Sequence, residues 1–583
     1  MQNHRRQVRE RESSVPSNPG FLSLTLVTLV IIVGQSTATF SKDFGLPSGY
    51  VVTLDEDGLS SVTFGGKTVA TGNVQLLDGT WFYEPFASRS YTPAVISKSV
   101  SYLSNGANVS HGYSGALKAL ANYSYAITGN DILVSVRVTN QSSKASSIVA
   151  FRSPRFLFAD WAAAIASSNQ LGYDQSHTQY NGVKLSYPSV SVAFAATYAR
   201  TASTSGAPIN FCTWSSESPE ERFMTMGFGI YPLPGVSLGN FFFKTVPAFG
   251  SQTFKFSYRF TESEDAHVLL QGYKDTLRAR LPQQYDPDAR PLAQFASINV
   301  SYIRPDNPYG YNDGGGGIFR RFDTLAGCKD YVAKLVPPMR QANFQGMIMW
   351  QPQGINPRGV QYRPDFDVFP PETLANLPTL VNGFKNAGLK IGLLARPGVV
   401  ITAASERTDG LKRASNNRTE LADLGKRLRW AKNRGFASFY LDSFVADGPD
   451  QRILKFIRNQ LGREIQTFTE HSTVLTLPLS GAYLEFTYAN GEYVFPQGYR
   501  DLSWIYPEAV WCANFRGALP PGGYPALYAY MFQNKLTPLI QDFQLLDPQR
   551  MATLQTLVAQ YIDGNHRWKG VRLPAPRRAR RTN

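Results

Sequence analysis

Cysteine and histidine are scarce in this sequence, and the patterns of several enzyme classes are missing with them. The 583 residues include three cysteines and six histidines. Three cysteines allow at most one disulfide, so the chain is not a disulfide scaffold. The histidines are scattered, without an HExxH pair or paired-cysteine spacing, so we expect neither a metal site nor a cofactor. No GxSxG elbow stands at a strand-to-helix turn, which argues against a Ser-His-Asp hydrolase.

Acidic residues are also fewer than basic ones, with 43 Asp and Glu against 58 Lys and Arg. The formal net charge of +15 is concentrated at the two ends of the chain. Four arginines lie within residues 1–20, and residues 566–583 form a basic tail without an acid. Basic ends of this kind can bind nucleic acid, but short peripheral ones are usually solvated. We therefore expect a disordered tail and no nucleic-acid partner.

The N-terminus has the pattern of a secretory signal. An uncharged run from Phe21 to Val33 follows the arginines, and small residues follow the run at Ser36-Thr37-Ala38. This order predicts that residues 1–39 are a signal peptide, or an uncleaved signal anchor that holds the chain to a membrane through residues 21–38. Either form places the body in a secreted, extracellular or lumenal compartment. Five glycosylation sequons agree with that compartment, at Asn108, Asn122, Asn140, Asn299 and Asn417.

Residues 40–280 predict a β-rich domain. Short runs of alternating or β-branched residues are separated by turn residues, which is the pattern of antiparallel strands. We expect strands at 50–54, 58–70, 131–139, 190–194, 223–230 and 253–260. Such spacing favours a β-sandwich or supersandwich. Residues 262–282 then predict a helical connector.

Residues 281–565 predict a (β/α)8 barrel, because short apolar runs alternate with segments of helical periodicity. The expected strands cover 295–303, 347–350, 389–395, 436–441, 465–470, 482–488, 510–514 and 536–541. The expected helices cover 331–342, 371–387, 421–433, 449–461 and 548–561. The fold class is thus a β-sandwich followed by a TIM barrel.

Two carboxylates follow neighbouring strands of this barrel, Asp442 after the fourth and Glu470 after the fifth. Alternation places Tyr440 and Asp442 on one face of the fourth strand, toward the barrel axis. The carboxyl ends of the strands carry the chemistry of such barrels, and two carboxylates are what glycosidic bond cleavage needs. Glu470 could instead form a structural ion pair, and Asp442 could cap a helix. Glu485, within the sixth strand, is the alternative acid.

Further candidates for substrate binding come from other strand ends. Tyr440 shares a strand face with Asp442, Trp350 could stack on a sugar face, and Arg396, Asp306 and Asp542 could bind hydroxyl groups. His471 alternates to the other face from Glu470 and is expected to pack or to support the site from behind.

The segment Phe439-Tyr-Leu-Asp-Ser443, with Thr469-Glu-His471 after it, resembles glycoside-hydrolase-like barrel proteins. The order of a β-sandwich and then a barrel resembles the α-galactosidase and α-glucosidase types, and the strand positions of Asp442 and Glu470 resemble the α-amylase clan. The chain lacks the arginine of that clan two residues before the aspartate, where Tyr440 stands, and its Asn-His-Asp on strand seven. The α-galactosidase pattern implies an acid on strand six, which would be Glu485.

The resemblance implies a glycosidase in which Asp442 is the nucleophile and Glu470 the acid/base. The expected activity is cleavage of O-glycosidic bonds in an oligo- or polysaccharide by a retaining mechanism. Two alternatives stay open: a glycan-binding protein on a degenerate barrel, and a transglycosylase with the same site.

Overall fold

The computed structural model describes residues 41–571 with gaps. Outside the described residues lie 1–40, 73, 78–93, 115–117, 146–148, 153, 158–167, 173–178, 181–182, 185–190, 199–206, 208, 215–221, 228–236, 243–245, 264, 296–302, 313–316, 351, 353, 355–368, 396–398, 402–410, 414–416, 443–450, 471, 473, 475, 496–498 and 572–583. The expected signal segment, Arg396 and His471 are therefore outside the description. Within it, no helix has the length and apolar character needed to cross a membrane.

Residues 42–260 form antiparallel sheets, as the alternating runs predicted. The five-stranded sheet has the order β1-β2-β3-β4-β11, with β1 Lys42–Gly45, β2 Tyr50–Asp55, β3 Gly58–Phe64, β4 Lys67–Thr71 and β11 Arg155–Phe156. The larger sheet runs β5-β10-β18-β17-β15-β16-β19-β9-β8-β7-β6, and β12 pairs with β15. Its bounds are β5 Gln75–Leu77, β6 Ala94–Leu103, β7 Gly106–Ser114, β8 Ala119–Thr128, β9 Asp131–Asn140, β10 Val149–Arg152, β12 Ser168–Gly172, β15 Ser191–Tyr198, β16 Ile209–Trp214, β17 Arg222–Gly227, β18 Ser237–Phe242 and β19 Ser251–Phe260. Strands β13 Gln179–Tyr180 and β14 Val183–Lys184 form a separate hairpin.

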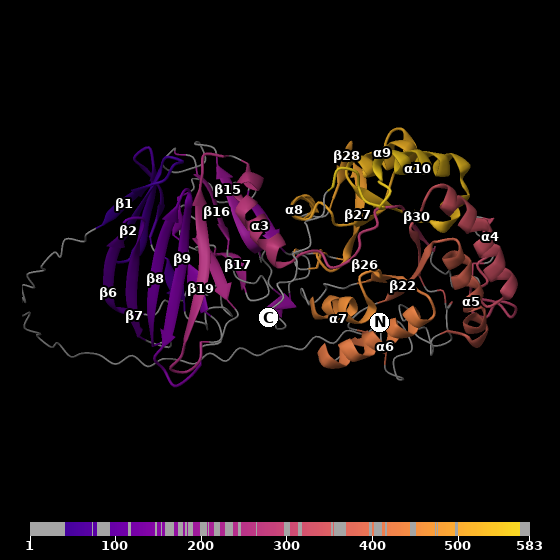
Figure 1. Ribbon diagram of the computed structural model, residues 1–583, viewed down its shortest axis with the longest axis horizontal. Helices are drawn as coiled ribbons and strands as arrows, with labels where there is room; N and C mark the ends of the chain where they lie inside the picture. Colours follow the sequence, from indigo (N-terminus) through magenta and orange to yellow (C-terminus); the bar gives the residue numbers. More distant parts are fainter. Residues whose placement is uncertain are drawn as a thin grey trace, which may run out of the picture. The chain divides into compact units, whose positions relative to one another are not determined.

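The two large sheets share one hydrophobic core, so the arrangement is sandwich-like. Buried side chains from both sheets, such as Val52 and Val136, belong to a single cluster. Strand β9 shows how the alternation works, since every second residue from Ile132 is buried. Figure 1 shows β6, β7, β8, β9 and β19 in the order of their pairing. His111 is a buried polar member of this region, and its Nε2 donates to the carbonyl oxygen of Glu56 at 2.8 Å.

The barrel is closed and its eight strands are parallel, as predicted. The strands are β20 Leu292–Gln294, β21 Gly346–Met349, β22 Lys390–Ala395, β25 Ser438–Leu441, β26 Gln466–Thr469, β27 Gly481–Ala489, β29 Trp511–Arg516 and β30 Leu536–Gln541. They pair in chain order, and β30 pairs with β20 to complete the ring. The first strand lies just before its predicted range of 295–303. A short strand β28, Glu492–Val494, adds antiparallel to β27.

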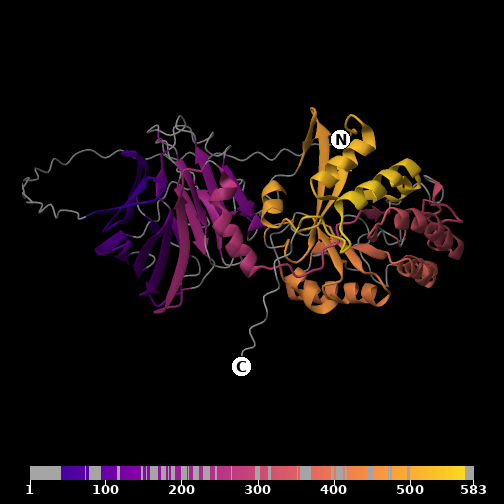
Figure 2. The same cartoon turned by 45° about the horizontal axis from the view of Figure 1, so that its top comes forward.

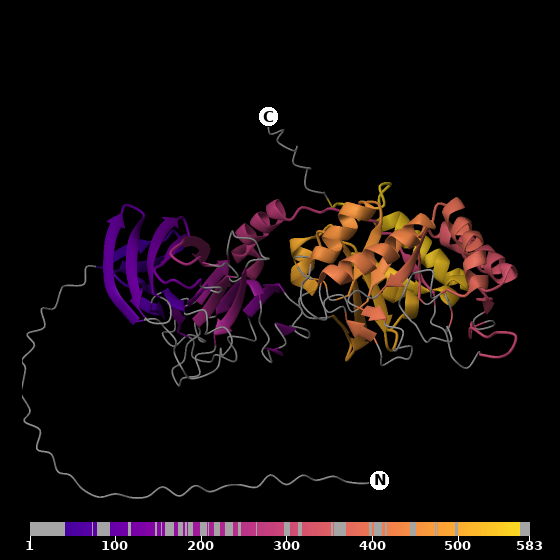
Figure 3. The ribbon, with the colours of Figure 1, turned by 90° about the horizontal axis from the view of Figure 1, so that it is seen from below.

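The helices lie outside these strands (Figure 2 and Figure 3). They are α4 Leu325–Gln341, α5 Pro371–Asn386, α6 Asn417–Asn433, α7 Gln451–Leu461, α8 Tyr499–Ile505, α9 Gly523–Gln533 and α10 Pro548–Tyr561, with a 3-10 turn η6 at Asp542–Leu546. The predicted connector is the pair α2 Ala266–Leu269 and α3 Gln271–Arg280, and β23 Val399–Ile401 pairs with β24 Leu411–Arg413.

Local signals explain where two of these helices begin. Thr324 caps α4 by accepting from the Gly327 backbone at 3.1 Å, and Asp547 caps α10 by accepting from Gln549 at 3.0 Å. Such caps satisfy amide groups that have no partner within the helix. The described residues between β26 and β27 form turns rather than a helix. Asp442 and Glu470 follow β25 and β26, which are paired strands of the closed barrel.

Candidate active site

The barrel interior is sealed by one layer of side chains to which each strand contributes a residue. The layer comprises Leu292, Ile348, Leu394, Tyr440, Phe468, Tyr483, Cys512 and Leu539, with Tyr285 and Val510 beside it. All of these side chains are buried. Because side chains alternate along a strand, the residue two positions after each member also faces the axis, one layer nearer the carboxyl ends. That second layer is the mouth of the barrel.

The register of β25 and β26 brings Asp442 and Glu470 to neighbouring positions in this mouth. Leu441 pairs with Thr469 at the last step of the ladder. The Glu470 amide donates to the Leu441 carbonyl oxygen at 3.3 Å, so the ladder continues past the strand ends. Adjacent strands lie about 4.8 Å apart. The two carboxylates therefore arise from positions side by side, on the same face of the sheet.

The predicted facing of the fourth strand is confirmed. Tyr440 belongs to the inner layer, whereas Phe439 and Leu441 belong to the core between strands and helices. Burial raises the pKa of Tyr440 above its usual value, and the charge of Glu470 adds to the effect. Asp442 acts on it in the same direction. Both carboxylates thus lie close enough to Tyr440 to act on its titration.

Glu485 stands at the mouth on β27, two positions after Tyr483. Its Oε1 accepts from the Tyr483 hydroxyl at 2.6 Å and from Arg516 Nη2 at 2.6 Å. Asn514 Nδ2 donates to the Tyr483 hydroxyl at 3.0 Å. Glu485 is exposed, and its carboxylate is fixed by partners on β27 and β29. To act as a proton donor, Glu485 would first have to break its ion pair with Arg516.

An aromatic stack forms the floor between these groups. Trp350 and Tyr440 are stacked with ring centroids 5.3 Å apart, and Tyr440 lies 4.6 Å from Tyr483. Tyr440 is 3% exposed, so little of its ring is open to a sugar. Trp350 also lines a cavity at the mouth, so its position suits the predicted stacking on a sugar.

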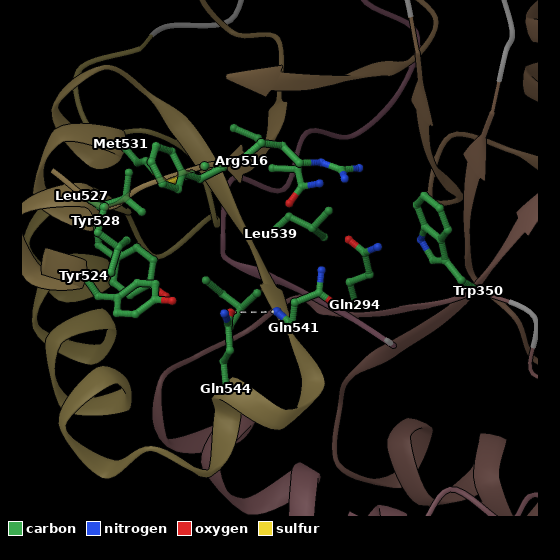
Figure 4. A pocket seen from close by; sticks show the side chains of 16 residues that line it. Gln294, Trp350, Arg516, Tyr524, Leu527, Tyr528, Met531, Leu539, Gln541 and Gln544 are labelled. Atoms are coloured by element: carbon green, nitrogen blue, oxygen red, sulfur yellow. Dashed lines mark hydrogen bonds between the residues drawn. The ribbon is translucent and has the colours of Figure 1, made fainter. Parts of the chain in front are cut away.

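That cavity has a volume of about 380 Å³ and lies on the side of the mouth formed by β29, β30 and β20. Its polar lining includes Gln294, Asn514, Arg516, Gln541 and Gln544, and its apolar part lies along α9 with Tyr524, Leu527, Tyr528 and Met531. In Figure 4 the side chain of Gln294 lies between those of Trp350 and Gln541. The cavity has the size and mixed lining of a small-ligand site.

Two predicted contacts lie elsewhere. Asp306 is exposed, with 71% of its side chain accessible, and pairs with Arg304 at 2.9 Å. The Arg304 guanidinium holds the pKa of Asp306 below its usual value. Asp542 is wholly buried and pairs with the equally buried Arg320 at 2.7 Å. Asp542 follows β30 as the first residue of η6, and it also accepts from Tyr331 of α4 at 3.2 Å, which favours a structural role.

The sequence prediction did not single out the amides of the mouth, Gln294, Asn514 and Gln541. Asn514 and Gln541 end predicted strands, and alternation from Cys512 and Leu539 could have placed them on the inner face. Gln294 was missed because the first strand was placed after it. In the described part of the chain, no group of three or more His, Cys, Asp or Glu side chains could hold a metal ion.

No protein-family model matches the sequence, and no curated protein sequence matches it. Among solved structures, the fold is similar to that of an α-N-acetylgalactosaminidase from Bifidobacterium bifidum. A quadruple mutant of that enzyme matches with a TM-score of 0.53 and 15% identity, over 88% of this chain and 92% of that one. Its GalNAc complex matches with a TM-score of 0.50 and 13% identity, over 89% and 93%. At these identities the likeness shows the fold alone, which is glycosidase-like.

Proposed function

We propose that this chain is a glycoside hydrolase that cleaves O-glycosidic bonds of an oligo- or polysaccharide and retains the anomeric configuration. The observation that carries the proposal is the neighbouring placement of Asp442 and Glu470 at the carboxyl ends of β25 and β26. Retaining glycosidases hold their two carboxyl groups about 5–5.5 Å apart. The strand spacing of about 4.8 Å is compatible with that separation.

In the proposed reaction, Asp442 attacks the anomeric carbon while Glu470 gives its proton to the leaving oxygen. The bond to the leaving group breaks as the bond to Asp442 forms. Glu470, now ionised, takes a proton from water, and the hydroxide oxygen displaces Asp442 from the sugar. Tyr440 stays protonated beneath the two carboxylates because its pKa is raised.

The acid is assigned to Glu470 rather than to Glu485 because of their partners. Glu485 already accepts hydrogen bonds from both Tyr483 and Arg516, so its carboxylate is engaged within the protein. Glu485 also lies two strands away from Asp442, since β26 separates β25 from β27. The likeness to an α-N-acetylgalactosaminidase fold keeps Glu485 as the alternative acid, because the α-galactosidase type carries its acid on strand six.

We also propose the accessory features that the sequence suggests. The sandwich-like region would be a supersandwich that supports the barrel, and the body would be secreted or lumenal through the segment 1–39. The exposed sequons at Asn108 and Asn122 would carry glycans in that compartment, whereas Asn140 is buried and its side-chain amide donates to the Lys144 carbonyl oxygen. The partner would be a carbohydrate, with no nucleic acid and no membrane contact beyond residues 21–38.

The test compares Asp442→Asn, Glu470→Gln and Glu485→Gln on aryl glycosides whose leaving groups differ in acidity. Asp442→Asn should abolish turnover on all of them. Glu470→Gln should lose about 10²–10⁴-fold on poor leaving groups and far less on dinitrophenyl glycosides, which need no proton in the first step. Added azide should rescue that variant by replacing water.

The control is Glu464→Gln, which changes an exposed carboxylate that pairs with Lys432 outside the mouth. It should keep full activity. If Glu485→Gln shows the leaving-group pattern and Glu470→Gln does not, the acid is Glu485. If Asp442→Asn keeps full activity, the mechanism is wrong. If the wild type binds glycans and cleaves none, the glycan-binding alternative holds. Formation of new glycosides in place of free sugar would identify a transglycosylase.

A further inference from the structure

Six of the eight positions at the mouth of the barrel form two chemically different halves. Asp442, Glu470 and Glu485 follow the inner-layer residues of three consecutive strands, β25, β26 and β27. Gln294, Asn514 and Gln541 occupy the same level on the next three strands of the ring, β29, β30 and β20. One half thus carries carboxylates and the other carries amides. The proposed chemistry uses the first half only.

Gln294 is the informative member of the amide half. Its residue is 6% exposed, and its Oε1 is buried without a hydrogen-bond partner. In the described part of the chain its amide nitrogen makes no hydrogen bond either. A buried polar atom without a partner is unfavourable and uncommon in proteins. Gln294 lines the cavity, so a bound molecule could supply the missing partner.

The side-chain amides of Gln541 and Asn514 each make one hydrogen bond within the protein. One keeps a donor for a ligand and the other keeps an acceptor. The side chain of Gln541 accepts from the Gln544 backbone in a capping box, which leaves its NH2 group for the cavity. Asn514 donates to the Tyr483 hydroxyl, which leaves its carbonyl oxygen. Together the three amides offer donors and acceptors on one side of the cavity. A sugar hydroxyl, which donates and accepts, suits such a set.

The charges near the cavity argue for an uncharged ligand. Arg516 is the lining cation among the described residues, and it already pairs with Glu485 at 2.6 Å. Two further carboxylates, Asp442 and Glu470, stand across the mouth. Among the described residues of the mouth, these three carboxylates outnumber the one lining cation, so we expect a neutral sugar to be favoured over an anionic one.

We propose that the amide half of the mouth binds a neutral sugar ring, with Gln294 as its specificity-determining contact and Trp350 as its stacking surface. This inference rests on the proposed glycosidase function and names the class of sugar that the same site takes. The ring would lie in the cavity of about 380 Å³, against Trp350.

The test measures binding apart from turnover, in the full chain carrying Asp442→Asn. Galactose, glucose and N-acetylgalactosamine are compared with galacturonate and glucuronate by saturation-transfer NMR titration. A matched control is available in Ser438→Ala. The Ser438 hydroxyl is also buried without a partner inside the barrel, on the face of Tyr440, but it does not line the cavity.

At least one neutral sugar should bind, and the uronates should bind at least tenfold more weakly. Gln294→Leu should weaken the neutral sugar about tenfold, or about 1.4 kcal/mol. Ser438→Ala should change its affinity less than twofold. Neither variant should lower the melting temperature, because each removes an unpartnered polar atom.

Three results would overturn the inference: uronates that bind as well as neutral sugars, no effect of Gln294→Leu, or no binding of any neutral sugar. A loss in Ser438→Ala equal to that in Gln294→Leu would be a fourth such result, because the effect would then be general. If the wild type hydrolyses no glycoside but binds a sugar in a way that depends on Gln294, the proposed hydrolysis is wrong. The sugar site inferred here would then still be supported.

Discussion

Replacing Asp542 by asparagine should destabilise the barrel without weakening substrate binding. The Asp542 carboxylate is 0% exposed and the Arg320 guanidinium 1% exposed. They form a two-pronged pair, with Nε to Oδ2 at 2.7 Å and Nη2 to Oδ1 at 2.9 Å. Tyr331 adds a hydrogen bond to Oδ2 at 3.2 Å. Asparagine keeps the shape but removes the negative charge that pairs with Arg320.

The expected magnitude follows from that burial. Removing one partner of a buried pair costs about 3–5 kcal/mol of unfolding free energy. For a domain of this size, 1 kcal/mol moves the melting temperature by about 2 °C. The melting temperature of Asp542→Asn should therefore fall by roughly 6–10 °C. Glu464→Gln, which loses an exposed pair, should change it by about 1 °C or less.

The assay is thermal unfolding followed by circular dichroism, with KM measured on the same preparations at a temperature where both variants are folded. A double variant, Arg320→Met with Asp542→Leu, should recover much of the loss because an apolar pair of similar volume removes both charges. A melting temperature that stays within about 2 °C of the wild type, together with a raised KM, would refute the structural reading. Asp542 would then be the substrate contact that the sequence suggested.

Two further predictions concern stability. Burial lowers the pKa of His111 below its usual 6.5, so its contribution to the free energy of unfolding is present above pH 6.5 and lost as the pH falls. Denaturant titrations between pH 5 and 8 should show a slope that His111→Gln flattens, and equal slopes would exclude the effect. Gly346→Ala should destabilise the barrel by about 3 kcal/mol or more, because its Cβ would lie 2.0 Å from the Lys390 carbonyl oxygen. Gly45→Ala, with open space around it, is the control, and equal melting temperatures would contradict the steric argument.

Periodicity predicted the strand ladder well because each strand is short and buried. The eighth strand was expected at 536–541 and lies there, and the fourth strand has the predicted inner and outer faces. These features depend on residues close together in the sequence. Alternation over four or five residues is enough to assign a face.

Contacts between distant residues were not predictable in the same way. The partner of Asp542 is Arg320, which lies on a loop more than two hundred residues earlier, and nothing local marks the two as a pair. The usable signal was side-chain alternation along the predicted strand 536–541. It places Gln541 on the inner face, so the next residue, Asp542, is not expected to face the axis. Gln294 was not predicted as a site residue because its strand has three residues, which are too few to show a periodic pattern.

The closure of the ring has a consequence for how this chain folds. Leu292 on β20 pairs with Leu539 on β30, so the first barrel strand finds its last neighbour only after almost the whole barrel sequence has been made. Until then β20 and β29 are open edges, and open parallel edges are prone to pair with other chains. The amide half of the mouth spans this seam, with Gln294 on one side and Gln541 on the other. A truncated chain that ends before β30 could still carry all three carboxylates, but it would lose Gln541 and the strand that joins the two sides of the proposed sugar site.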